Sequence, residues 1–347
     1  MVFPKQEFNK ASVKDANLDK GILVDLFNEI EKEKFNIHSL LLVRNGSKVF
    51  HAEAEGYTED TRDEVYSVSK SFLSIAIGIL LDRSLLNLED YVLFFFKNEV
   101  KNYLPEYEAL KVKHLLTMSV GQAEDAFPNL NPDSNFFEVF FNQALTSKPG
   151  ETFMYNNFAS FMLSAIVTKV TGNSLNDFLN ENLYKVIAME KPVWRAVNGI
   201  SLGATGLQVS SHDLARFGLL LLNDGNWDGL QVVSRDYLKA ATSLQIKTDN
   251  QENDYDKFGY GYQFWMNSFG DFRCTGYLSQ HVVINKEFNL VFVCKANEER
   301  KILYLFEDFV LKATKSGYKL NEFSLRDFTR RFKSHSHKLI ELEKENK

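Results

Sequence analysis

A serine and a lysine stand one helical turn apart in Ser67-Val-Ser-Lys70, at the head of an apolar segment that runs to Leu81. Residues spaced by three lie on one face of a helix, so the two side chains can meet. A serine hydroxyl is a weak nucleophile that needs an adjacent base. A lysine is such a base only where burial or a neighbouring charge lowers its pKa. Segment 66–81 is apolar around nearly its whole circumference, which predicts a buried helix. The pattern therefore favours Ser67 as nucleophile and Lys70 as its base.

The Ser-x-x-Lys string alone is weak, because Ser316-Gly-Tyr-Lys319 matches it in a polar stretch broken by glycine. Two further elements separate the two matches. The first is Met154-Tyr-Asn-Asn157, which offers a tyrosine to relay protons and an amide to hydrogen-bond a lysine; its simpler interpretation is a helix N-cap. The second is Arg273-Cys-Thr-Gly276 at a strand, where a glycine lets a substrate approach the backbone closely.

In this order, the three elements resemble those of the serine β-lactamase, penicillin-binding-protein and carboxylesterase superfamily. The Tyr-x-Asn form of the second element is similar to the class C and esterase branch. The third is most similar to 6-aminohexanoate-dimer hydrolase and related esterases. The resemblance covers approximately residues 20–315, and further matches lie in segments 66–72, 114–121 and 206–218.

The resemblance implies a role for each matching residue. Ser67 would attack an ester or amide carbonyl and form an acyl-enzyme. Lys70 would take its proton, with Tyr155 as partner base and as acid to the leaving group. Asn157 would hydrogen-bond near Lys70, and the backbone N–H groups of Ser67 and Tyr277 would form the oxyanion hole. Water or an acceptor alcohol or amine would resolve the acyl-enzyme, without a cofactor.

The third element departs from the family pattern. Cys274 stands where the family often has a lysine or histidine, and that cation is implied in holding a substrate carboxylate. Arg273 is adjacent, but strand alternation points it to the opposite face. Ser279 stands where the branch usually has a glycine. Cys274 and Gly276 are still expected in the substrate-binding region, and a catalytic Cys274 is disfavoured because a buried cysteine is more often a small apolar filler.

Composition disfavours several other classes of function. The net charge of −6 gives no case for a nucleic-acid partner. The histidines are scattered and the two cysteines form no ligand pair, so no metal site is predicted. His212 is expected to be a first-turn helix residue, and a metal contact by His335 and His337 is weighed against a solvated tail. The chain as given has no secretory leader or apolar membrane span, which predicts a cytoplasmic protein. The sequence predicts no oligomeric state.

The pattern of elements predicts an α/β fold of the α+β type: an antiparallel sheet built from both chain ends, flanked by helices, with an inserted all-helical region. A helix is expected near 18–35, and a hairpin turns at Asn45-Gly46. Strands are expected at 260–266, 273–285 and 290–295. The predicted units are a discontinuous sheet domain over 1–66 and 190–315, a mainly helical region over 67–189 and a charged tail over 316–347.

Three hypotheses for function follow. The first is a serine hydrolase acting on small esters or amides. The second is a catalytically impaired binding or regulatory member of the fold, which the altered third element keeps open. The third is a β-lactamase or D,D-peptidase, which the missing leader and the missing cation both disfavour.

Overall fold

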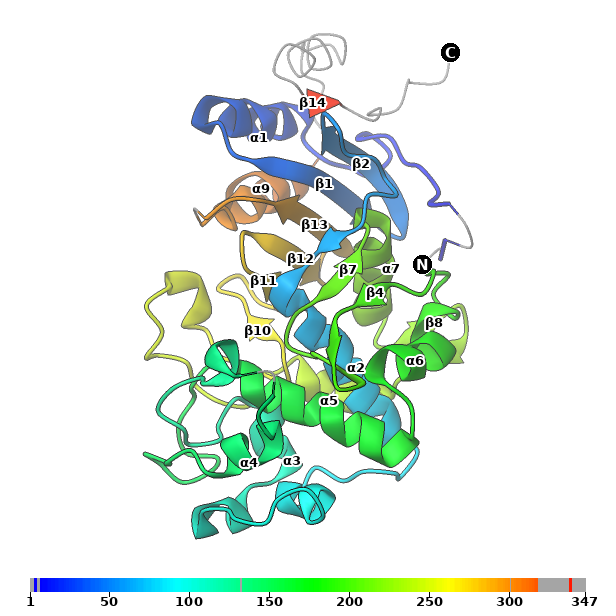
Figure 1. Cartoon of the computed structure of the whole chain (residues 1–347). Coiled ribbons are helices and arrows are strands. Elements are labelled where there is room, and N and C mark those ends of the chain that lie inside the picture. The colour runs from blue at the N-terminus through cyan, green and yellow to red at the C-terminus, as the bar shows by residue number, and fades with distance from the viewer. Residues whose placement is uncertain (1–2, 5–6, 132, 300, 318–336, 339–347) are drawn as a thin grey trace.

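The computed structural model of the chain describes residues 3–4, 7–131, 133–299, 301–317 and 337–338. Its centre is an antiparallel sheet in the order β10-β11-β12-β13-β1-β2-β14, with a mainly helical region below it in Figure 1. The first two strands and the later ones lie far apart in the sequence but side by side in space, as the predicted sheet from both chain ends requires. The strands of the sheet are β1 (Ile37–Arg44), β2 (Ser47–Ala54), β10 (Trp265–Met266), β11 (Phe272–Gly276), β12 (Gln280–Asn285), β13 (Leu290–Ala296) and β14 (His337–Lys338).

The central strands are buried on both faces. In β1, Leu41 and Val43 pack into the core shared with the helical region, whereas Leu40 and Leu42 pack into a second core on the other face. Successive side chains of a strand point to opposite faces, so this continuous apolar run feeds both cores. The sheet therefore separates two hydrophobic cores.

Helices cover both faces of this sheet. α1 contacts α9 on one face, and α7 contacts β13, β12 and β1 on the other. α2 and α5 contact each other within the larger core. The helices are α1 (Lys20–Glu33), α2 (Ser69–Asp82), α3 (Val112–Leu116), α4 (Phe136–Phe141), α5 (Asn157–Thr171), α6 (Leu175–Leu179), α7 (Ser211–Leu222), α8 (Arg235–Ala241) and α9 (Lys312–Ser316).

Short strands link the helical region to the sheet layer. β7 pairs with both β3 and β4, which brings the segment before α2 next to the segment before α7. No helix among the described residues is long and apolar enough to cross a bilayer. The short strands are β3 (Asp63–Glu64), β4 (Val193–Trp194), β5 (Ala196–Val197), β6 (Ile200–Ser201), β7 (Leu207–Val209), β8 (Asn226–Trp227) and β9 (Leu230–Gln231).

Local sequence predictions are confirmed where turn residues mark the ends of elements. Asn45 and Gly46 both have positive φ, at 52° and 83°, as the hairpin predicted. The single strand expected over 273–285 is wrong, because β11 and β12 form a hairpin there. Its turn has Leu278 and Ser279 at φ of 57° and 63°, a conformation that these residue types rarely adopt. The sequence therefore carried no ordinary turn signal.

Candidate active site

Ser67 lies in a tight 3-10 turn, Tyr66–Val68, that leads directly into α2. The residue before it, Tyr66, has φ of 45°, in the left-handed region that bulky residues seldom occupy. Such backbone strain clusters at functional sites. The turn leaves Ser67 partly exposed at the entrance to α2, while the following twelve residues of the helix are buried.

The side chain of Lys70 is buried, with 1% of its surface exposed. Its Nζ donates to Oγ of Ser67 at 3.0 Å, to Oδ1 of Asn157 at 2.7 Å and to the carbonyl oxygen of Ala204 at 2.9 Å. These three acceptors match the three N–H donors of an ammonium. Burial lowers the pKa of Lys70 to about 7, against the opposing pull of the negative charge on Asp125. The amine is therefore able to exchange its proton near neutral pH.

Of the three partners of Lys70, only Ser67 can reverse the direction of its hydrogen bond. The oxygens of Asn157 and Ala204 accept only, whereas a hydroxyl can also donate. When Nζ is neutral, its lone pair can accept the proton of Ser67 at the same 3.0 Å separation. The arrangement can thus carry a proton from the hydroxyl to the amine.

Asp125 is a residue of this site that the sequence analysis missed. Its Oδ2 accepts from Nδ2 of Asn157 at 2.7 Å and from the backbone N–H of the same residue at 3.0 Å. Because the Asn157 amide nitrogen is directed to Asp125, its amide oxygen is directed to Lys70. A lone aspartate in a loop after α3 carried no motif, and only the fold brings it to the start of α5.

Tyr155 is the second side chain, after Lys70, that lies next to Ser67. Its hydroxyl lies next to the side chain of Ser67, and Nζ of Lys70 lies 4.8 Å from the centre of its ring. The ring stacks on Trp265, with centroids 5.7 Å apart and planes inclined by 18°. Burial raises the pKa of Tyr155, so its phenol is protonated at neutral pH. Ser67 therefore touches a group that can accept a proton and a group that can donate one.

Gly276 ends β11 directly against the turn that holds Ser67. A Cβ built on it would lie 2.3 Å from the carbonyl oxygen of Val65 and 3.2 Å from the backbone nitrogen of Ser67. Any side chain here would push the strand away from the turn. The next residue, Tyr277, is 61% exposed and meets Tyr66 edge to face at 5.6 Å. The glycine thus lets β11 pack directly against the turn that bears Ser67, and Tyr277 lines the same cavity as Ser67.

Cys274 and Arg273 lie on opposite faces of β11. Cys274 is 1% exposed and its thiol lies next to Ser71 behind the site, and burial raises its pKa to about 12. Cys274 is not among the residues that line the cavity in front of Ser67. Arg273 lines that cavity and forms an ion pair with Asp256, which the sequence analysis also missed. The guanidinium further donates to the carbonyl oxygens of Tyr255 and Met266.

The cavity in front of Ser67 has a volume of about 420 Å³. Its size suits a small organic substrate. Its wall combines the predicted residues Ser67, Tyr155, Gly276 and Tyr277 with residues from the β10–β11 region and from the segment after β13. These four residues therefore come together at one opening, whereas Lys70, Asn157 and Cys274 are not among the residues that line it.

Comparison with known proteins agrees with this geometry. The family model described as Beta-lactamase matches residues 31–311. The chain belongs to the beta-lactamase family. Members of this family share a mixed fold with an antiparallel sheet, and hydrolases are among the structures that this chain resembles.

Relatives of this beta-lactamase family member include Protein flp of Staphylococcus aureus (strain MW2), which is 29% identical over 192 residues. That match covers 50% of this chain and only 38% of the relative. An uncharacterized protein of Alkalihalophilus pseudofirmus is 24% identical over 269 residues, covering 69% of this chain and 75% of its own length.

Solved structures of the family have the same fold. A candidate 6-aminohexanoate-dimer hydrolase from Bacillus anthracis superposes with a TM-score of 0.72 at 22% identity, covering 90% of this chain and 89% of its own. EstCE1, a hydrolase with promiscuous acyltransferase activity, superposes with a TM-score of 0.67 at 13% identity, covering 85% and 97%. At these identities the likeness concerns the fold alone.

Proposed function

We propose that this protein is a serine hydrolase that cleaves small esters or amides through an acyl-enzyme on Ser67. Lys70 is the general base, and Tyr155 is its partner and the acid to the leaving group. The observation that supports this most directly is the 3.0 Å hydrogen bond between Nζ of Lys70 and Oγ of Ser67, made by an amine with a pKa of about 7.

In the acylation step, Oγ of Ser67 bonds to the substrate carbonyl carbon while its proton passes to Nζ of Lys70. The negative charge that develops on the carbonyl oxygen is stabilised by the N–H groups of Ser67 and Tyr277. The bond to the leaving oxygen or nitrogen then breaks as Tyr155 donates its phenolic proton, and Lys70 returns a proton to Tyr155. Water attacks the ester and gives up a proton through the same groups, which releases the acid and restores Ser67.

Neither Arg273 nor Cys274 offers a free cation to a substrate carboxylate. The charge of Arg273 is already balanced by Asp256, and its nitrogens donate to backbone carbonyls. Cys274 replaces the family's usual cation with a neutral, buried thiol. A substrate carboxylate would therefore find no free partner in this pair. Among the described residues, the other cation of the cavity wall is Lys301, in the segment after β13, so the preference for esters and amides over β-lactams is based on the loss of the cation at position 274.

Labelling with a fluorophosphonate probe and turnover of p-nitrophenyl acetate test the proposal. We expect wild-type protein to be labelled once and to turn over the ester, and Ser67→Ala to do neither. Ser316→Ala is a matched control, because it removes the serine of the other Ser-x-x-Lys string; its hydroxyl donates to Asp19 at 3.0 Å, away from the cavity. Labelling that survives in Ser67→Ala, or is absent from the wild type, rejects the proposal.

A further inference from the structure

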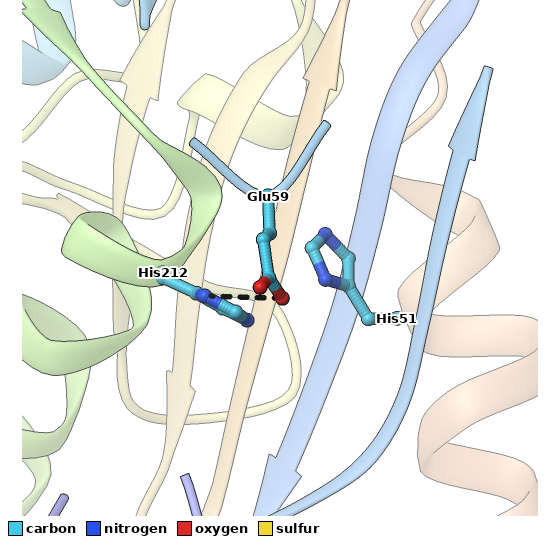
Figure 2. A group of neighbouring side chains, drawn as sticks. All are labelled: His51, Glu59 and His212. Atoms are coloured by element: carbon cyan, nitrogen blue, oxygen red, sulfur yellow. Dashed lines mark ion pairs between the residues drawn. The ribbon is translucent and has the colours of Figure 1, made fainter. Parts of the chain in front are cut away.

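A second cluster of side chains lies between the sheet and α7, at a different cavity from the one at Ser67. His51 comes from β2, Glu59 from the loop that follows it, and His212 from the first turn of α7. Figure 2 shows the carboxylate of Glu59 beside the two imidazole rings, whose centroids lie 4.9 Å apart. One ligand-type atom from each residue lies within 4.8 Å of the other two. These residues are far apart in the sequence, so only the fold assembles them.

His51 presents an unsatisfied nitrogen to this cluster. The residue is 1% exposed, and its Nδ1 has no hydrogen-bond partner among the described residues. Its Nε2 lies 3.1 Å from Oε1 of Glu53 and 3.0 Å from Oγ of Ser39. Two acceptor oxygens, of Ser39 and Glu53, lie beside Nε2, and the ring tautomer that carries its proton there leaves a lone pair on Nδ1. A buried acceptor without a donor requires an explanation.

The buried carboxylate of Glu53, behind His51, also indicates that a ligand binds at Nδ1 of His51. The side chain of Glu53 is fully buried, and neither of its oxygens makes a hydrogen bond within the described part of the chain. A carboxylate that orients a histidine from behind is the usual second partner of a metal-bound imidazole, because it fixes the tautomer and raises the basicity of the ligand. Glu53 lies in this position, 3.1 Å from Nε2 of His51, and a cation bound at Nδ1 would convert the contact into the hydrogen bond that the carboxylate lacks.

We propose that His51, Glu59 and His212 bind a divalent transition-metal ion, Zn²⁺ in particular. Two imidazoles and one carboxylate are a recognised Zn²⁺ ligand set. The ligand atoms of a tetrahedral site lie about 3.4 Å apart, and Nδ1 of His212 is already 3.8 Å from Oε2 of Glu59. The side chain of Glu59 is 46% exposed and can close the remaining gap. The proposal is independent of the function assigned to Ser67.

The cluster opens on a cavity of about 750 Å³, lined by Glu59 and His212 among others. This cavity gives an ion and its waters a path to the ligands. Lys48 competes with a metal ion for the carboxylate of Glu59. Its Nζ lies 3.9 Å from Oε2 of Glu59 and 3.4 Å from Nε2 of His212. The metal would bind on the Nδ1 side of His212 and displace the lysine from Glu59. Removing that positive charge must therefore strengthen binding of the ion.

Equilibrium dialysis of the full chain against Zn²⁺ alone, with competition by a chromogenic chelator, measures the stoichiometry and affinity. We expect one tightly bound Zn²⁺ in the wild type. Glu59→Gln and His212→Gln should each weaken its binding by more than the roughly 10- to 100-fold that loss of an outer-shell partner causes, and Lys48→Met should tighten it by about tenfold. Asp60→Asn is the matched control, because it changes a carboxylate that lines the same cavity outside the proposed ligand set.

Two additional measurements separate this site from other causes. His335 and His337 could also bind Zn²⁺, so the double variant His335→Ala/His337→Ala should retain full binding. Co²⁺ in place of Zn²⁺ should give a visible absorption band that Glu59→Gln loses. Thermal unfolding of each variant without metal checks that it is folded. Three results each overturn the proposal: no stoichiometric Zn²⁺ in the wild type, unchanged affinity in both ligand variants, and loss of binding in the tail variant.

Discussion

The buried amine of Lys70 donates a 2.7 Å hydrogen bond to the side-chain oxygen of Asn157, whose amide nitrogen is held in turn by Asp125. A carboxylate thus acts on the proposed base without touching it directly. It orients the amide and contributes a negative charge that opposes the effect of burial on the pKa of Lys70. This relationship makes the proposed mechanism testable through its dependence on pH.

The proposed base can be removed while its packing is largely kept. Lys70→Met retains the unbranched side chain but has no group to take the proton of Ser67. We expect kcat/KM for p-nitrophenyl acetate to fall by about 10²- to 10⁴-fold, the range of general-base catalysis, with the fold retained by circular dichroism. Activity within a few-fold of the wild type would assign the base to another residue.

The activity should rise with pH through the pKa of Lys70. Only the neutral amine accepts a proton, and burial lowers its pKa to about 7, so kcat/KM should climb through neutral pH and level off above about pH 8. The measurement is a pH–rate profile of ester hydrolysis. A profile that is flat across neutral pH contradicts the assignment of Lys70.

Asp125→Asn should move that profile toward lower pH. The negative charge of Asp125 raises the pKa of Lys70, so its removal lowers this pKa and the amine becomes neutral at more acidic pH. Glu124→Gln is the matched control: Glu124 is the exposed neighbour, and its change should leave the profile in place. A purely structural role of Asp125 would lower kcat without shifting the profile.

Gly276→Ala should impair both stability and turnover. The new methyl group would lie 2.3 Å from the carbonyl oxygen of Val65, so β11 must move away from Ser67. We expect a loss of about 1–3 kcal/mol in the free energy of unfolding and a larger fall in kcat than in apparent affinity. Gly270→Ala controls for stability alone: it strains a positive-φ turn in open space and should leave turnover unchanged. Equal losses of turnover in the two variants would show that close packing of Gly276 against the Ser67 turn has no specific role in catalysis.

Neither cysteine should react as a catalytic thiol. Cys274 and Cys294 are both buried, and burial raises the pKa of each thiol, to about 12 for Cys274. A thiol reagent such as Ellman's should therefore find no reactive group in the native protein at pH 8 and two in denaturant. Cys274→Ala should retain ester hydrolysis. Rapid labelling of native Cys274, or loss of turnover in this variant, would instead support a catalytic thiol.

The sequence predicted most of the sheet and the buried helix after Ser67, because these depend on local patterns. Asn45-Gly46 encodes its hairpin, and the apolar circumference of α2 encodes its burial. The turn between β11 and β12 was missed because Leu278 and Ser279 adopt positive φ only under tertiary constraint. The same constraint explains Tyr66, whose strained conformation precedes Ser67.

The sequence by itself determined the nucleophile candidate, its lysine one turn later, and the order of the elements that bear Tyr155 and Gly276, because spacing along a helix and motif order are properties of the chain. Only the tertiary structure decided the electrostatics. Asp125, Ala204 and Asp256 reach the site from distant segments, and the pKa of Lys70 depends on how completely those segments exclude water from it. The same holds for His51, Glu59 and His212: burial and charge at a point in space are set by every segment that packs there, and no local pattern records them.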